Sequence, residues 1–170
     1  MNRRAALLGL LSATVAACIP AAGVKIGPDG LPLPQVYRIA ADGQDAVMFH
    51  LLDGMNALRK AARLQPVAYN AQLNAAAATH SRDMAIQNRP WHFGSDGSSP
   101  LDRGRRVGFP GRIMGENISE TYETELETLA AWMRQEDTRA VILDPTITVI
   151  GFAWYQEPAG KIWWTLVTGR

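Results

Sequence analysis

The pattern of apolar and polar positions changes at about residue 45, from irregular to regularly helical. From Asp45 onward, apolar side chains recur at steps of three and four residues, so that Met48, Leu51, Met55 and Leu58 lie on one helical stripe. This spacing predicts a first helix that starts near Asp45 and packs one face against a core.

A second helix is predicted to start at Ala71, with Asn70 as the residue that caps its N-terminus. Its inner stripe comprises Leu73, Ala76, Ala77, His80 and Met84. The helix should end by Asn88, because Pro90 disfavours helical geometry in the residue before it.

Beyond residue 90 the pattern alternates between loop, helix and strand. In chain order it predicts a loop with one short helix over 91–111, a strand over 113–119, a helix over 120–135, a helical turn over 138–143, and strands over 147–155 and 161–168. The last two strands flank Glu157-Pro158-Ala159-Gly160, which predicts a hairpin, and Trp163 and Trp164 should face opposite sides of the sheet. This order indicates an α+β fold, a three-layer α-β-α sandwich with a small antiparallel sheet.

The first eighteen residues have the pattern of a lipoprotein leader. Arg3 and Arg4 precede an apolar run that ends at Ala17, too short to span a membrane. Val15-Ala16-Ala17-Cys18 resembles the bacterial lipobox, in which an aliphatic residue and two small ones precede a Cys that becomes acylated. We therefore expect a signal peptide over residues 1–18, and a membrane anchor at Cys18 on the extracytoplasmic side of a bacterial envelope. An ordinary signal peptide with an incidental Cys is the alternative.

Residues 19–44 are rich in Pro and Gly, which favours an extended tether between the anchor and a single domain over residues 45–170. The 17 basic residues include Arg3 and Arg4 of the leader, so 15 remain against 16 acidic residues. A nearly neutral domain excludes nucleic acid as a partner. Cys18 is the only Cys, so the domain has no disulfide, thiolate ligand or cysteine nucleophile.

A set of short motifs runs through the predicted domain in a characteristic order. They are Asn56-Ala57-Leu58-Arg59, His80-Ser81-Arg82-Asp83-Met84, Trp91-His92-Phe93, Gly115-Glu116-Asn117-Ile118, Trp132-Met133, the stretch from Arg139 to Pro145, Ile150-Gly151-Phe152 and Trp163-Trp164-Thr165. Over about residues 46 to 168 the chain resembles the CAP superfamily, also called the SCP or pathogenesis-related-1-like domain, in its short bacterial form.

The resemblance implies an α-β-α sandwich whose cleft holds two His and two acidic residues, able in some members to bind a divalent metal. His92 matches the first His, and Glu116 matches the acid of the Gly-Glu-Asn segment. Thr138 stands where many bacterial members have a His, and Gln135 stands where longer members carry the second Glu. With two of the four groups missing, we expect no tight metal site and no cofactor.

The same residues leave the role of the cleft open. His92 and Glu116 could form a general acid/base pair, although the sequence offers no nucleophile in an elbow pattern. The favoured interpretation is that Glu116 accepts a hydrogen bond from His92 and fixes the loop to the sheet. His80 is expected to be a hydrogen-bonded core residue, and His50 a partly exposed one. In the basic cluster of Arg103, Arg105, Arg106 and Arg112, Arg103 is expected to pair with an acid of the loop.

Three functions are consistent with these features. The first is a lipid-anchored, non-catalytic module that binds a lipid or an envelope ligand such as a polymer, since several members of the family bind sterols or fatty acids. The second is an envelope hydrolase of peptidase type that uses His92 and Glu116. The third is a structural or interaction protein without a small ligand.

Overall fold

The computed structural model describes residues 27–31 and 37–170, and residues 37–170 belong to one folded unit. Residues 27–31 form a turn of their own, in which the amide of Gly27 donates to the carbonyl of Leu31. The predicted signal peptide, the lipobox and Cys18 lie outside the described residues. Within the described part of the chain, no helix has the length and apolar character needed to cross a membrane.

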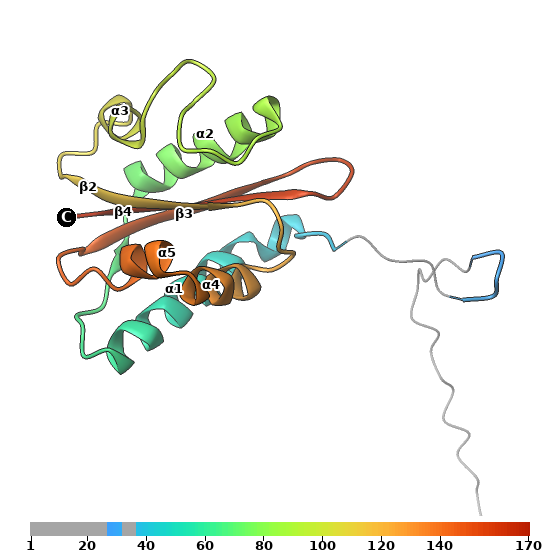
Figure 1. Ribbon diagram of the computed structural model, residues 1–170, viewed down its shortest axis with the longest axis horizontal. Coiled ribbons are helices and arrows are strands. Elements are labelled where there is room, and N and C mark those ends of the chain that lie inside the picture. Colours follow the sequence, from blue (N-terminus) through green and yellow to red (C-terminus); the bar gives the residue numbers. More distant parts are fainter. Residues whose placement is uncertain (1–26, 32–36) are drawn as a thin grey trace, which may run out of the picture. The chain divides into compact units, whose positions relative to one another are not determined.

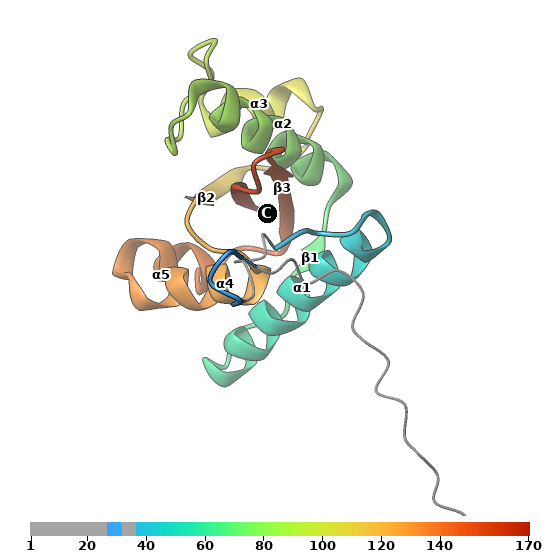
Figure 2. The ribbon, with the colours of Figure 1, turned by 90° about the vertical axis from the view of Figure 1, so that its right-hand side faces the viewer.

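Three layers make up the folded unit, as Figures 1 and 2 show. One face of the sheet is covered by α1 (Gln44–Ala61), α4 (Glu125–Arg134) and α5 (Glu136–Ile142), with the 3-10 turn η1 (Ala41–Gly43) leading into α1. The other face is covered by α2 (Ala71–Gln87) and α3 (Pro100–Arg106). This arrangement confirms the predicted α+β sandwich.

The sheet contains β1 (Ala68–Tyr69), β2 (Ile113–Ser119), β3 (Val149–Gln156) and β4 (Ile162–Gly169), in the order β1-β3-β4-β2. β3 and β4 form the predicted hairpin, and β2 pairs antiparallel with β4. β1 pairs with β3 in parallel, so the small sheet, predicted as antiparallel, is antiparallel over β2, β3 and β4 and gains one short parallel edge strand. A parallel edge arises because β1 precedes the crossover helix α2, which returns the chain in the same direction.

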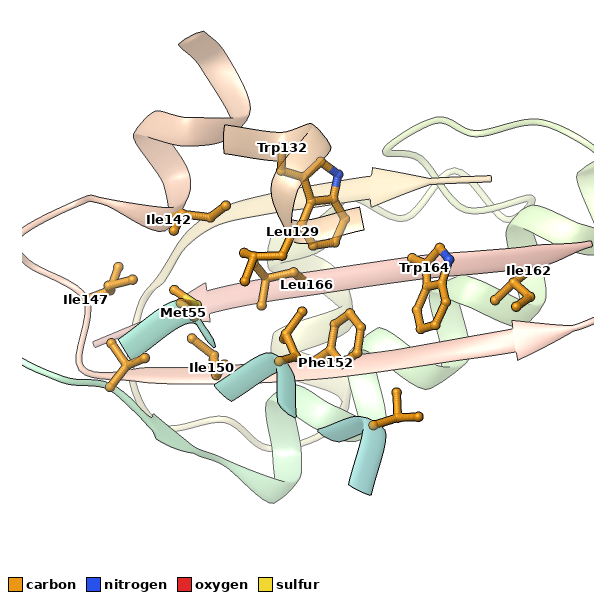
Figure 3. Close-up of a cluster of buried hydrophobic side chains, with 13 residues drawn as sticks. Met55, Leu129, Trp132, Ile142, Ile147, Ile150, Phe152, Ile162, Trp164 and Leu166 are labelled. Atoms are coloured by element: carbon orange, nitrogen blue, oxygen red, sulfur yellow. The ribbon is translucent and has the colours of Figure 1, made fainter. Parts of the chain in front are cut away.

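The face of the sheet towards α1, α4 and α5 carries the main hydrophobic core, shown in Figure 3. Phe152 and Trp164 stack with their ring centroids 5.5 Å apart and their planes within 10°. The indole of Trp164 donates to the carbonyl of Tyr122 at 2.8 Å, so its only polar atom is satisfied. Trp163 points to the opposite face, and both Trp side chains are buried as predicted.

The face towards α2 is built from small and polar side chains. A Cβ on Gly151 would lie only 2.1 Å from the carbonyl carbon of Leu73, so the backbones of β3 and α2 touch. Nearby, Ser81 donates a 2.8 Å hydrogen bond to the hydroxyl of Thr165, and both side chains are fully buried. Close backbone contact on this face brings α2 near enough to the sheet for polar side chains to meet across it.

The helix predicted over 120–135 begins five residues later, at Glu125. Thr124 caps it: its hydroxyl accepts from the amide of Glu127, and the Glu127 carboxylate accepts from the amide of Thr124. Tyr122, predicted to lie on the helix, instead precedes it and presents its carbonyl to Trp164. The two short helices predicted in outline are α3 and α5, and α3 also starts with a capping box, formed by Ser99 and Asp102.

Residues 37–44 were assigned to the tether, but they pack against the domain. Tyr37 and Ile39 contact the core, and the amide of Ile39 donates to the side chain of Gln156 at 3.1 Å. The guanidinium of Arg38 donates to the carbonyls of Glu157 and Pro158 in the hairpin loop. The described chain therefore joins the folded unit at the tip of the β3–β4 hairpin.

Candidate functional site

Four side chains from four elements meet at the edge of the sheet. Glu116 comes from β2, His80 from the inner face of α2, His92 from the loop after α2, and Arg103 from α3. Side chains alternate along a strand, so Glu116 points towards α2 and α3 while Asn117 points towards α5. β2 is an edge strand, and the groove described below therefore continues from one face of the sheet to the other.

The carboxylate of Glu116 lies at the centre of this cluster with 2% of its side chain exposed. Its Oε1 lies 2.9 Å from Nδ1 of His92 and 3.6 Å from Nε2 of His80. Its Oε2 accepts a 2.6 Å hydrogen bond from Nη2 of Arg103. Both oxygens are thus engaged by groups that fix their position, and the buried charge is paired, as burial requires.

Arg103 fixes both the carboxylate and the loop that carries His92. Its guanidinium donates to the carbonyl of His92 at 3.2 Å and to the carbonyl of Ser98 at 3.0 Å, and only 4% of the residue is exposed. We predicted a partner for Arg103 among the acids of the loop, and the structure places that partner on β2 instead. The planar fork of an Arg explains how one side chain reaches two carbonyls and a carboxylate.

His80 is the residue that sequence reasoning placed least well. It is fully buried, as predicted, but within the described residues neither ring nitrogen forms a hydrogen bond, which corrects the expectation of a hydrogen-bonded core residue. Burial lowers the pKa of His80, and the nearby Glu116 opposes that effect only in part, so the imidazole is neutral at pH 7. The inner stripe of the second helix showed that His80 faces the sheet, but not which strand residue it meets.

The loop itself is held by carboxylates that are not part of the cluster. Asp83 of α2 accepts from the amide and the hydroxyl of Ser95 at 2.7 and 2.6 Å. Asp96 accepts from the amide of Ser98 at 2.9 Å and pairs with Arg106. Hydrogen bonds from Ser98 and the contact with Arg106 hold the pKa of Asp96 well below its usual value. The loop therefore presents His92 from a fixed frame.

A groove of about 330 Å³ runs beside His92. It is lined by Pro90, Trp91, His92, Phe93, Glu116, Asn117, Ile118 and Thr138. Most of this lining is apolar, and His92 offers the accessible polar group because half of its side chain, 52%, is exposed. A groove of this kind suits an apolar molecule that carries one hydrogen-bonding group.

The structure brings three of the four predicted site residues together and leaves the fourth outside. Thr138 reaches the groove from α5, but its hydroxyl donates to the carbonyl of Trp132 at 2.6 Å. Asn117 donates to the carbonyl of Thr138 at 2.8 Å and so joins α5 to β2. Gln135 is exposed at the N-cap of α5 and does not line the groove. Among residues 27–31 and 37–170, no three His, Cys, Asp or Glu side chains are placed to hold a metal ion.

The chemistry of this cluster is that of a fixed acceptor. An oxygen of Glu116, 2.9 Å from Nδ1 of His92, can fix the orientation of the imidazole ring. The same carboxylate is already occupied by Arg103, and the one hydroxyl of the groove lining, that of Thr138, is committed to a backbone carbonyl. The arrangement is well suited to hold a loop and present one imidazole to a ligand.

Comparison with known proteins places this geometry in a family. The model of the CAP family, described as the cysteine-rich secretory protein family, matches residues 52–168. The uncharacterized protein YkwD of Bacillus subtilis is 32% identical over 115 residues, which is 68% of this chain and 44% of that protein. The chain thus spans less than half the length of this curated relative.

Solved structures share the fold at low sequence identity. An outer surface protein of Borrelia burgdorferi matches 76% of this chain and 95% of its own, with a TM-score of 0.69 and 16% identity. An extracellular protein of Bacillus anthracis that contains an SCP domain matches 78% of this chain and 44% of its own, with a TM-score of 0.69 and 23% identity.

Proposed function

Because the chain belongs to the CAP family, that of the cysteine-rich secretory proteins, we propose that it is a non-catalytic binding module, anchored by lipid outside the cytoplasm, that holds a lipid or another apolar envelope ligand beside His92. The leader pattern over residues 1–18 supports the location. Two structural relatives have names that describe an outer surface protein and an extracellular protein, which agrees with it.

One observation carries the binding role: the carboxylate of Glu116 is buried and paired with Arg103, while the groove beside it is mainly apolar. A general base needs a carboxylate or imidazole that can exchange a proton with a substrate. Glu116 has 2% of its side chain exposed and both oxygens occupied, so it serves to orient His92. What remains available to a ligand is an apolar surface with one imidazole at its edge.

Ligand analysis of the purified protein tests this proposal. Native mass spectrometry of protein extracted in mild detergent should detect a bound apolar molecule. Phe93→Ser should lower its occupancy at least tenfold, because Phe93 lines the groove and is 46% exposed. Leu101→Ser is the matched control, since Leu101 is 50% exposed on α3 and does not line the groove. Wild-type protein that carries no ligand and binds no added fatty acid would contradict the proposal and favour the structural or interaction role.

A hydrolase is the second candidate, and the 2.9 Å contact between His92 and Glu116 is the observation that favours it. Envelope polymers and peptides incubated with wild type and with His92→Ala separate the two roles. Hydrolysis that disappears in His92→Ala would overturn the non-catalytic assignment.

The anchor is tested separately. Labelling of cells with a fatty-acid analogue should mark the wild-type chain and leave Cys18→Ser unmarked. Equal labelling of the two forms would end the lipoprotein assignment without affecting the proposal for the groove.

A further inference from the structure

We propose that the end of the domain formed by the last turns of α2 and the β3–β4 hairpin rests on an anionic membrane surface. We call this region the basic-aromatic end and define it by Arg82, Ile86, Arg89, Tyr155, Lys161 and Trp163. It adjoins the groove where Arg89 lies over Trp91, and its orientation towards the membrane rests on the lipid anchor proposed above.

Three cationic side chains of this region lie over aromatic rings. Arg82 lies 4.8 Å from the ring centre of Tyr155, Lys161 lies 3.8 Å from that of Trp163, and Arg89 lies 3.7 Å from that of the adjoining Trp91. Such stacking holds a cation at the surface while its apolar stem covers the ring. Trp163 itself is buried, whereas Tyr155 and Trp91 are partly exposed, and partly exposed aromatic rings beside basic side chains are the combination found at the level of lipid headgroups.

An exposed apolar side chain lies between two of these cations. Ile86 is 74% exposed, more than any other large apolar residue among those described. Arg82 is four residues before it on α2, so these two side chains share one side of the helix, and Arg89 follows the left-handed C-cap residue Asn88. A hollow of about 420 Å³ beside them is lined by Arg82, Ala85, Ile86, Asn88, Tyr155 and Glu157. An aliphatic side chain flanked by cations is suited to contact acyl chains while the cations contact phosphates.

The charges of this end favour an anionic surface. Two carboxylates of this end are already engaged, because Glu120 pairs with Lys161 and Glu157 accepts from the indole of Trp163 at 2.6 Å. Within residues 27–31 and 37–170, no carboxylate forms an ion pair with Arg82 or Arg89. These two guanidinium groups are therefore free to contact lipid phosphates. Each Arg or Lys near a membrane surface strengthens binding about fivefold.

The folded unit begins at the same end of the domain. Arg38 binds the carbonyls of the hairpin loop, and the carbonyl of Tyr37 accepts from the side chain of Gln156 at 2.7 Å. Figure 1 shows the start of the folded unit, the hairpin tip and the end of α2 on one side, and the C-terminus on the opposite side. Cys18 is nineteen residues before Tyr37, a separation of at most about 65 Å for a fully extended chain. The basic-aromatic end is thus the end at which the chain enters the domain from the side of the proposed anchor.

One introduced cysteine tests the contact with the membrane. It would carry the only free thiol, because acylation would block that of Cys18, the only natural cysteine. The full chain carrying Ile86→Cys, with an environment-sensitive fluorophore on the new thiol, is reconstituted with vesicles. We expect the fluorescence emission to shift to the blue with vesicles that contain phosphatidylglycerol. We expect little shift with vesicles of phosphatidylcholine alone, or in 0.5 M salt, where the screening length is about 4 Å. Leu101→Cys, at a half-exposed position on α3, should show no shift with either lipid.

Charge variants complete the test. Arg82→Glu with Arg89→Glu should abolish the shift of the Ile86→Cys probe, with at least a tenfold loss of docking. Arg134→Glu with Arg139→Glu is the control, since it makes the same charge change at exposed residues on the other face of the sheet and should leave the shift intact. An equal shift on neutral vesicles, an unchanged shift in the Arg82/Arg89 variant, or no shift with phosphatidylglycerol would overturn the proposal. Failure of the anchor gives a different result. The chain would no longer attach to neutral vesicles, but the probe would still report docking on phosphatidylglycerol vesicles.

Discussion

The two faces of the sheet are stabilised in different ways, although they share the same strands. The face towards α1, α4 and α5 is filled by large apolar side chains such as Phe152, Trp164 and Leu166. The face towards α2 has a backbone contact at Gly151, a buried hydroxyl pair, and the charged cluster around Glu116. Figure 2 shows both layers from the side.

The difference shows why the candidate site lies on the α2 side. Large side chains keep a helix away from a sheet, whereas glycine and alanine let it approach until polar groups on both can bond. On the apolar face, stability comes from buried area and tolerates changes of shape. On the α2 face, stability depends on contacts that a single methyl or a single lost charge can destroy. The predictions below test this contrast.

The largest effect is expected from Gly151→Ala. The added methyl would lie 2.1–2.3 Å from backbone atoms of Leu73 and Asn74, which cannot move without displacing α2. We expect a loss of more than about 3 kcal/mol in the free energy of unfolding, beyond ordinary overpacking. Phe152 is the neighbouring residue on the other face. Phe152→Leu should cost only about 1–2 kcal/mol, although it removes buried side-chain atoms whereas Gly151→Ala adds one methyl group. Urea unfolding of both variants measures the contrast, and a Gly151→Ala domain as stable as Phe152→Leu would contradict it.

Arg103→Met should destabilise the domain by about 3–5 kcal/mol, because it leaves the carboxylate of Glu116 buried without its closest cation. The double variant with Glu116→Leu should recover part of that loss, since no uncompensated charge remains. A double-mutant cycle from thermal or urea unfolding measures the coupling. Additive effects of the two substitutions would show that the pair does not matter to this face.

His80 should make stability depend on pH below neutrality. Burial lowers its pKa in the folded state, so the unfolded chain binds more protons as the pH falls below about 6.5. The contribution of His80 to the free energy of unfolding is therefore fully present above that pH. It is lost on acidification, at up to about 1.4 kcal/mol per pH unit. Comparing urea midpoints between pH 7.5 and 5 in wild type and His80→Gln isolates this contribution. Parallel pH profiles would mean that His80 is not the cause.

The smallest effect is expected from the hydroxyl pair. Ser81→Ala removes one neutral hydrogen bond to Thr165 and should cost about 1 kcal/mol. Combining it with Thr165→Val replaces both hydroxyls by apolar groups and should cost no more than the single change. A loss larger than that of Arg103→Met would reverse the order proposed for this face.

Local patterns predicted most of the helices and strands, because these signals depend only on neighbouring residues. Asn70 caps α2 as expected, with its side chain accepting from the amide of Leu73 at 2.9 Å. The sequence also contains the signal for the late start of α4, because Thr124 and Glu127 have the spacing of a capping box. This signal outweighs the apolar stripe that begins at Tyr122. β1 has only two residues, so no period-two pattern exists in it to be recognised.

The site was predictable only in the part that motifs specify. His92 and Glu116 were identified as neighbours through their motifs, and the structure places them 2.9 Å apart. The approach of His80 to Glu116 depends on how closely α2 lies to the sheet, which is set by Gly151, a residue distant in sequence from both. The position of Gln135 outside the groove follows from its extended backbone at the start of α5, where a helix was not predicted to begin.

The order of the strands has a consequence for how the chain folds. β3 and β4, which occupy the centre of the sheet, are joined by the five residues 157–161, whereas β1 and β2 join them over much longer separations in sequence. Short loops cost less conformational entropy to close, so we expect the central hairpin to form early and the edge strands to add later. β2 carries Glu116, and its partner Arg103 comes from α3, which is likewise distant in sequence from the central hairpin. The candidate site should therefore be among the last parts of the domain to assemble, and substitutions there should speed unfolding more than they slow folding.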